Sequence, residues 1–107
     1  MTVVRAPAGL RRSGRGLWHA VTGEHELSER ERQLLRQAAL TADLIDDLSA
    51  RLAQGDLMST TSQGPRVNPL VVELRQQRIT LARLLAALRI TDDDTRTTGP
   101  RGVYTMR

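Results

Sequence analysis

The first candidates for chemistry are three aspartates that lie close together in the chain, at Asp43, Asp46 and Asp47. Carboxylate oxygens are preferred ligands of divalent cations such as Mg²⁺ and Ca²⁺, and a second acidic run at residues 92–94 could complete a cation site. The alternative is a solvated helix face on which Asp47 pairs with Arg51, four residues later. We favour this second interpretation, because residues 92–94 lie in a segment rich in Thr and Gly, which is a poor platform for a rigid metal site.

The other residue types provide no catalytic pattern. His19 and His25 have no third zinc ligand near them in the sequence. The chain contains no cysteine and no lysine, so thiolate metal sites and a Walker-type phosphate loop are excluded. The serines are scattered without a plausible catalytic triad. We therefore expect a protein that is not an enzyme and that has no cofactor and no bound metal.

Arginine is the most informative charged residue, because it supplies every basic side chain of a protein with a net charge of +4. A guanidinium group binds phosphate oxygens two at a time, although a GC-rich genome produces the same arginine bias. The first sixteen residues carry arginines and no acid. The primary candidates for DNA binding are Arg5, Arg11, Arg12 and Arg15, and the secondary candidates are Arg30, Arg32 and Arg36.

Trp18 is a further candidate, because an indole ring can stack on a base. A packing role is the more ordinary interpretation, since Leu17 and Val21 fall on the same side of a helix. We expect Trp18 to be a packing anchor.

Two apolar stripes position these residues, and they have the same alternating spacing of four and three. If the chain turns back near residue 61, the stripes pair in register as the seam of two antiparallel helices. The polar member Gln77 fixes that register if its amide finds a partner. The predicted seam consists of Leu34, Ala38, Thr41, Ile45, Leu48 and Leu52 on the first helix and Leu70, Leu74, Gln77, Leu81, Leu84 and Leu88 on the second.

Capping signals define the predicted helices. Ser28 and Glu31 can form a capping box that begins a helix over 28–54, with Gly55 in the left-handed conformation after it. Asn68 and Pro69 begin a second long helix over 69–89.

The remaining segments are less regular. A short helix is expected over 15–22, and residues 1–13 are expected to form a flexible basic arm. Residues 55–67 fit a small β-hairpin or an irregular loop, and we favour the loop. Residues 91–107 are expected to form a disordered tail. The predicted fold is therefore all-α: an antiparallel two-helix hairpin plus a short N-terminal helix, within a domain over 14–90.

A second apolar face predicts self-association, because a pair of helices cannot cover it. We expect a homo-oligomer. The chain has no apolar run near the roughly 20 residues of a membrane span, so we expect a soluble intracellular protein without membrane contact. The predicted oligomer interface consists of Leu35, Leu40, Leu44, Val71, Ile79 and Leu85.

The order of these elements resembles a known family. Residues 16–28 have the sequence GLWHAVTGEHELS, a leucine-rich helix follows, and residues 66–78 have the sequence RVNPLVVELRQQR. Together with the Arg-rich start, this order resembles the small subunit of phage terminase, in the variety found in long-tailed phages and prophages of GC-rich bacteria. The similarity covers about residues 14–90.

The resemblance implies a non-catalytic subunit of the viral genome-packaging machine in the host cytoplasm. Such subunits assemble into rings, bind the packaging start site on double-stranded viral DNA, and recruit and regulate the large ATPase–nuclease subunit. Two alternatives remain open: a helical-hairpin adaptor that binds only protein, and a small DNA-binding transcriptional regulator. The DNA-contact residues follow from charge position and not from a matched family motif.

Overall fold

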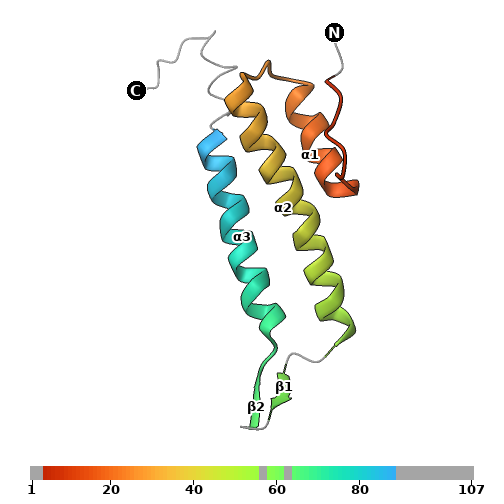
Figure 1. Ribbon diagram of the computed structural model, residues 1–107, viewed down its shortest axis with the longest axis vertical. Helices are drawn as coiled ribbons and strands as arrows, with labels where there is room; N and C mark the ends of the chain where they lie inside the picture. The colour runs from red at the N-terminus through yellow and green to blue at the C-terminus, as the bar shows by residue number, and fades with distance from the viewer. Residues whose placement is uncertain (1–3, 56–57, 62–63, 89–107) are drawn as a thin grey trace, which may run out of the picture.

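The computed structural model describes residues 4–55, 58–61 and 64–88. Within these ranges it contains three helices and one two-stranded antiparallel sheet. This content is consistent with the all-α class, to which the sheet is a small addition at one end of the molecule (Figure 1). None of the helices in the described ranges is long and apolar enough to cross a membrane. The predicted tail at 91–107, with the acidic run at 92–94, lies outside the described residues.

The long helix α2 (Glu29–Gln54) begins where the sequence predicts. Ser28 Oγ accepts the backbone N–H of Glu31 at 3.2 Å, and Glu31 Oε1 accepts the backbone N–H of Ser28 at 2.8 Å. The capping box is therefore confirmed. The prediction for the other end is wrong in one respect: Gly55 is extended, with φ −128° and ψ −179°, instead of left-handed. The next described element is a strand that begins at Met58.

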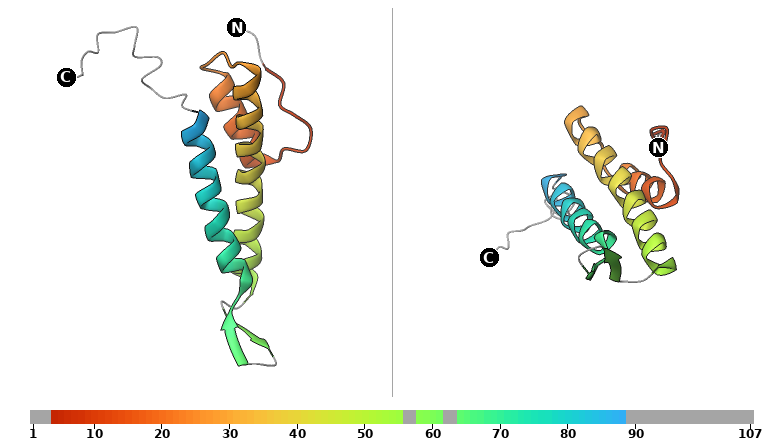
Figure 2. Two further views of the ribbon diagram at one scale, coloured as in Figure 1. Left: turned by 60° about the vertical axis from the view of Figure 1, so that its left-hand side comes forward. Right: turned by 60° about the horizontal axis from the view of Figure 1, so that its bottom comes forward.

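The helix α3 (Pro69–Leu88) also begins at its predicted residue. Asn68 Oδ1 accepts the backbone N–H of Leu70 at 2.9 Å, which satisfies one of the free amides of the first turn. Helices α2 and α3 lie side by side and run in opposite directions (Figures 1 and 2). All twelve predicted seam positions are buried or half-buried, with Leu48 and Leu74 about 5% and 6% exposed.

The strands β1 (Met58–Thr61) and β2 (Gly64–Val67) connect the two long helices. They pair antiparallel, with Met58 opposite Val67 and Thr61 opposite Gly64. The preference for an irregular loop is therefore wrong. Thr and Val favour extended backbone, and Pro65 is tolerated because both strands of a two-stranded sheet are edge strands.

The helix α1 (Arg12–Thr22) packs against α2, and its first turn reaches as far along α2 as Asp46. It begins three residues before the predicted start at residue 15 and ends at the predicted residue. The segment before it is not a free arm: residues 4–11 fold back along α1, and Gly9 makes this turn possible with φ +92° (Figure 2). Leu10 is 3% exposed, which explains why the segment packs instead of extending into solvent.

The hydrophobic core lies where α1, α2 and the end of α3 meet. Its buried members are Leu10, Trp18, Leu35, Ala39 and Leu88. Trp18 is 4% exposed, and its Nε1 donates a hydrogen bond to the backbone oxygen of Val4 at 3.2 Å. Its predicted role as a packing anchor is confirmed, and the N-terminal segment closes the core from outside.

Candidate nucleic-acid interface

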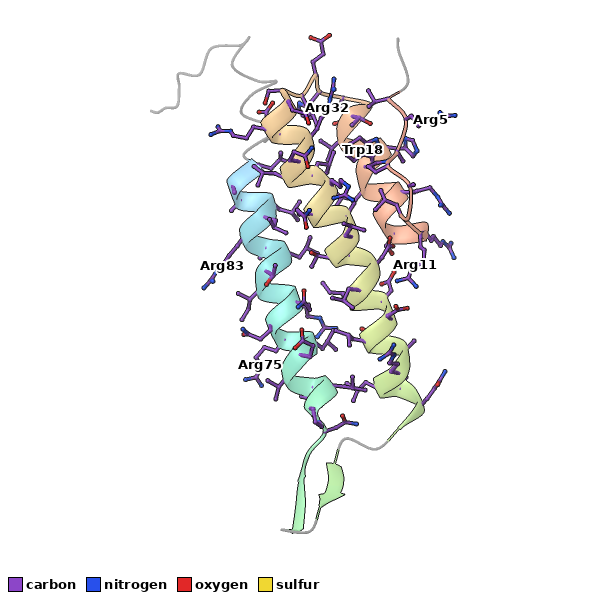
Figure 3. The ribbon with its side chains drawn as sticks, in the orientation of Figure 1. Arg5, Arg11, Trp18, Arg32, Arg75 and Arg83 are labelled. Carbon is purple, nitrogen blue, oxygen red and sulfur yellow. The ribbon has the colours of Figure 1, made fainter. Side chains whose placement is uncertain are left out.

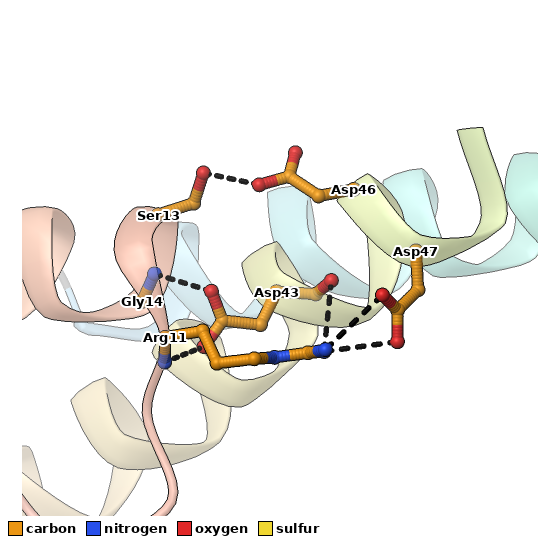
Figure 4. Close-up of polar contacts among 6 residues, drawn as sticks. All are labelled: Arg11, Ser13, Gly14, Asp43, Asp46 and Asp47. Atoms are coloured by element: carbon orange, nitrogen blue, oxygen red, sulfur yellow. Dashed lines mark hydrogen bonds and ion pairs between the residues drawn. The ribbon is translucent and has the colours of Figure 1, made fainter. Parts of the chain in front are cut away.

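The α1 helix is held on α2 by a buried carboxylate. Asp43, 4% exposed, accepts the backbone N–H of Arg11 at 2.6 Å through Oδ2 and the backbone N–H of Gly14 at 2.7 Å through Oδ1 (Figure 4). These amides belong to the N-terminal end of α1, where no residue of the same helix can accept them. Arg11 precedes α1 and supplies no side-chain cap. Asp43 therefore performs that function from the neighbouring helix.

Gly14 allows the close approach that this contact requires. A Cβ at Gly14 would lie 2.7 Å from the backbone oxygen of Ala39, and it would overlap the carboxylate of Asp43. Gly14 and Ala39 are both buried. Any side chain at residue 14 would consequently push α1 away from α2.

Two further aspartates contact the start of α1. The guanidinium of Arg11 donates to both carboxylate oxygens of Asp47, at 3.1 and 2.9 Å, and Ser13 Oγ donates to Asp46 (Figure 4). The hydrogen bond from Arg11 lowers the pKa of Asp47, and the same bond raises the pKa of Arg11. The sequence predicts Arg51 as the partner of Asp47. That prediction is wrong, because Asp47 forms its ion pair with Arg11, 36 positions away.

This geometry gives the three aspartates a structural role. Asp43 and Asp46 bind the first turn of α1, and Asp47 binds Arg11 just before it. Within the described residues no group of three or more His, Asp or Glu side chains could hold a metal ion. The same contacts change the interpretation of the basic N-terminus. Once the chain folds, the three carboxylates lie at the same end of α1 as Arg11.

Of the four primary DNA-binding candidates, Arg5, Arg12 and Arg15 remain available. All three are exposed, and none forms an ion pair with another described residue. Arg15 is partly fixed, because its Nη1 donates to the backbone oxygen of Leu10 at 2.6 Å. Figure 3 shows Arg5 and Arg11 on the α1 side of the molecule, away from Arg75 and Arg83 on α3. The guanidinium of Arg11, in contrast, is paired with the carboxylate of Asp47.

The exposed face of α1 also carries His19, which the positions of the arginines do not identify. Arg12, Arg15 and His19 are spaced three and four apart, so they lie on one side of the helix, and each is exposed. Gly16 lies on the same side, and a Cβ there would meet nothing within 4 Å. The helical spacing could have identified His19, had the helix been extended back to Arg12.

The secondary candidates do not form one surface. Arg30 and Arg32 are exposed, but two positions in a helix are separated by about 200° of rotation, so they point in nearly opposite directions. Arg32 Nη1 lies 3.9 Å from Glu29 Oε1, which makes a weak ion pair. Arg36 is half-buried. These residues do not extend the basic face of α1.

A pocket beside the turn between α1 and α2 does not extend the basic face of α1 either. Its lining consists of Val4, Thr22, Gly23, Glu24, His25, Glu26, Leu27 and Arg32. Because two glutamates face a single arginine and a histidine, the pocket has mixed charge.

The predicted oligomer interface is only partly exposed. Leu35 is completely buried in the core cluster with Leu10 and Trp18, so it cannot contact another subunit. Its assignment to the oligomer interface is therefore wrong. Leu40 and Val71 are half-buried. Leu44, Ile79 and Leu85 are 38–40% exposed and remain available for contacts between copies.

Comparison of the chain with protein-family models, with curated proteins and with solved structures finds no match.

Proposed function

We propose that this chain is the small, non-catalytic DNA-recognition subunit of a viral genome-packaging terminase. In this role it acts in the host cytoplasm as a homo-oligomer, in which α2 and α3 form the helical hairpin of each subunit. The oligomer is a ring that binds double-stranded viral DNA at the packaging start site. It recruits and regulates a large subunit that carries the ATPase and nuclease activities.

The observation that carries the proposal is the basic face of α1. Arg12 and Arg15 are exposed on a helix whose position is fixed by Asp43, and Arg5 lies on the segment that folds along it. Guanidinium groups without carboxylate partners are free to bind phosphate oxygens. A rigid helix holds them at constant spacing, so they lose less conformational entropy on binding than arginines on a flexible arm.

Oligomerisation strengthens such an interface. Two or three phosphate contacts per subunit give weak binding, but linked copies bind the same duplex with a high effective concentration. The exposed apolar side chains of α3, Val72 at 59% and Ile79 at 40%, supply a surface through which copies could associate.

The direct test is binding of the purified chain to duplex DNA in a gel-shift assay at moderate salt, with the packaging region of the phage genome against an unrelated duplex. The proposal predicts preferential binding to the packaging region and co-purification with the co-expressed large subunit. A chain that binds neither duplex and does not co-purify with the large subunit would refute it.

A protein–protein adaptor is the second candidate, favoured by the exposed apolar face of α3. An adaptor would bind a partner protein and leave DNA unshifted. A transcriptional regulator would shift its operator DNA as a dimer, so native mass spectrometry of the chain distinguishes it from a terminase subunit, for which a higher-order species is expected.

A further inference from the structure

The outer side of α3 carries a second stripe with seam spacing. We call this the outer α3 stripe: Val72, Arg75, Ile79, Ala82 and Ala86. The steps alternate between three and four residues, as in a helix-packing seam. By helical geometry this stripe lies about 160° around α3 from the seam that faces α2. All five residues are exposed, and four of them are apolar.

A corresponding stripe runs along the exposed side of α2. We call this the outer α2 stripe: Gln33, Gln37, Leu40, Leu44, Asp47 and Arg51. It has the same alternating spacing, and its residues are exposed or half-buried. It lies about 100° around α2 from the α3 seam. The stripe borders α1, because Leu40 packs against the core cluster and Asp47 binds Arg11. Its other members are exposed and leave room for another neighbour: Gln33, Gln37, Leu44 and Arg51.

The two outer stripes can pair in register, and one pair of opposite charges then falls together. Antiparallel pairing in the register predicted for the intramolecular seam places Arg75 opposite Asp47, and it places Ile79 within one residue of Leu44. The side chain of Asp47 is 42% exposed although it binds Arg11. A carboxylate has about four acceptor positions, so Asp47 can accept a second guanidinium.

Charge disfavours the pairing of α3 with itself. The described part of α3 has three exposed arginines, Arg75, Arg78 and Arg83, against a single acid, Glu73. Two copies of this face repel each other, whereas the outer α2 stripe offers a carboxylate at the required position.

We infer that the outer α3 stripe of one copy docks on the outer α2 stripe of the next copy, in a head-to-tail contact. Such a contact uses two different surfaces, so each added subunit leaves both surfaces available at the ends, and repetition gives a ring or an open array. The inference rests on the homo-oligomer of the proposed function and is independent of DNA binding.

Cysteine cross-linking tests this contact, because the natural chain has no cysteine. The variants Leu44→Cys and Ile79→Cys, prepared separately and then mixed under mild oxidation, should give one disulfide-linked dimer. Each variant alone should stay uncross-linked, and the double variant should give a ladder of higher species. Thr80→Cys is the matched control: it is exposed and adjacent to Ile79, but it lies off the stripe, so it should not cross-link to Leu44→Cys.

A charge variant provides an independent readout. Arg75→Glu should raise the concentration needed for assembly by about tenfold or more, because it places two acids opposite each other. Arg78→Glu makes the same charge change off the stripe and should leave assembly near the wild-type value.

Three results would overturn the inference: a homodimer formed by Ile79→Cys alone, a wild-type chain that is monomeric at micromolar concentration, or an oligomer without the mixed cross-link. Because no DNA is present, these results bear on the interface and not on DNA recognition. A chain that cross-links as expected but does not bind DNA contradicts the proposed function alone.

Discussion

Asp43 Oδ1 accepts the backbone N–H of Gly14 at 2.7 Å, and this bond joins residues 29 positions apart in the chain. The carboxylate replaces the N-cap that α1 lacks in its own sequence. It also fixes where α1 begins and how closely it approaches α2. The exposed arginines of α1 owe their position to this contact.

Asp43→Ala should destabilise the fold by about 1–3 kcal/mol, because it leaves the N–H groups of Arg11 and Gly14 without acceptors near the core. Urea denaturation monitored by circular dichroism measures the loss. The control is Asp46→Ala, which removes an exposed contact with Ser13 and should change stability by no more than about 0.5 kcal/mol. Equal losses in both variants would contradict the role assigned to Asp43.

Gly14→Ala and Gly16→Ala should change stability in opposite directions. The methyl group at residue 14 collides with Ala39 and Asp43, and overpacking of this kind costs about 1–3 kcal/mol. The methyl group at residue 16 meets nothing within 4 Å, and replacing a helical glycine by alanine stabilises a helix by about 0.5–1 kcal/mol. Thermal unfolding of the two variants checks this prediction, and a stabilised Gly14→Ala variant would disprove the close contact.

The Arg11–Asp47 pair should make stability depend on acid pH. The pKa of Asp47 is lowered in the folded state, chiefly by the hydrogen bond from Arg11. The folded protein therefore holds this proton less tightly than the unfolded chain. The pair's contribution is complete above the ordinary aspartate pKa of about 4, and it is lost as the pH falls through the lowered value.

The Tm difference between wild type and Asp47→Asn, measured from pH 7 down to pH 3, gives the readout. It should be constant near neutrality and shrink below about pH 4, and high salt should reduce it because the pair is exposed. A Tm difference that does not change with pH would show that Asp47 acts through packing and not through charge.

Leu10→Ala should cost about 2–5 kcal/mol of unfolding free energy, the usual effect of emptying a buried leucine site. If residues 4–11 formed a flexible arm, the same substitution would leave the free energy of unfolding unchanged. Emission of Trp18, which is the only tryptophan and packs in the same core cluster, reports the urea transition. A variant with the wild-type midpoint would mean that residues 4–11 do not pack against the core in solution.

The parts of the fold that sequence predicts well are those set by local chemistry. The capping box at Ser28, the start at Asn68 and the burial of the seam each follow from patterns within a few residues or within one helix. The sequence leaves the segment between α2 and α3 nearly undecided, because Thr and Val favour a strand whereas Gly64 and Pro65 favour a loop.

The parts that sequence missed depend on tertiary contacts. The start of α1 is set by Asp43, the burial of Leu35 by the folded N-terminal segment, and the pairing of Asp47 by Arg11. None of these contacts lies within one helical turn, so no local periodicity contains them. The candidate site shows the same division: charge position identifies its arginines, and helical spacing from Arg12 identifies the exposed His19. The pairing of Arg11 with Asp47 is visible only in the folded chain.

The proposed function depends on phosphate binding by the exposed arginines of α1, and a salt titration of DNA affinity tests this most directly. Fluorescence anisotropy with a labelled duplex would compare wild type with Arg12→Gln/Arg15→Gln. The control Arg78→Gln/Arg83→Gln removes the same charge from α3.

The affinity of wild type should fall steeply with salt, and loss of Arg12 and Arg15 should reduce the slope of log K against log salt by about 2 or more. The α3 control should keep the wild-type slope. Equal affinities and slopes for all three proteins would contradict the assignment of the α1 face as the DNA-binding surface.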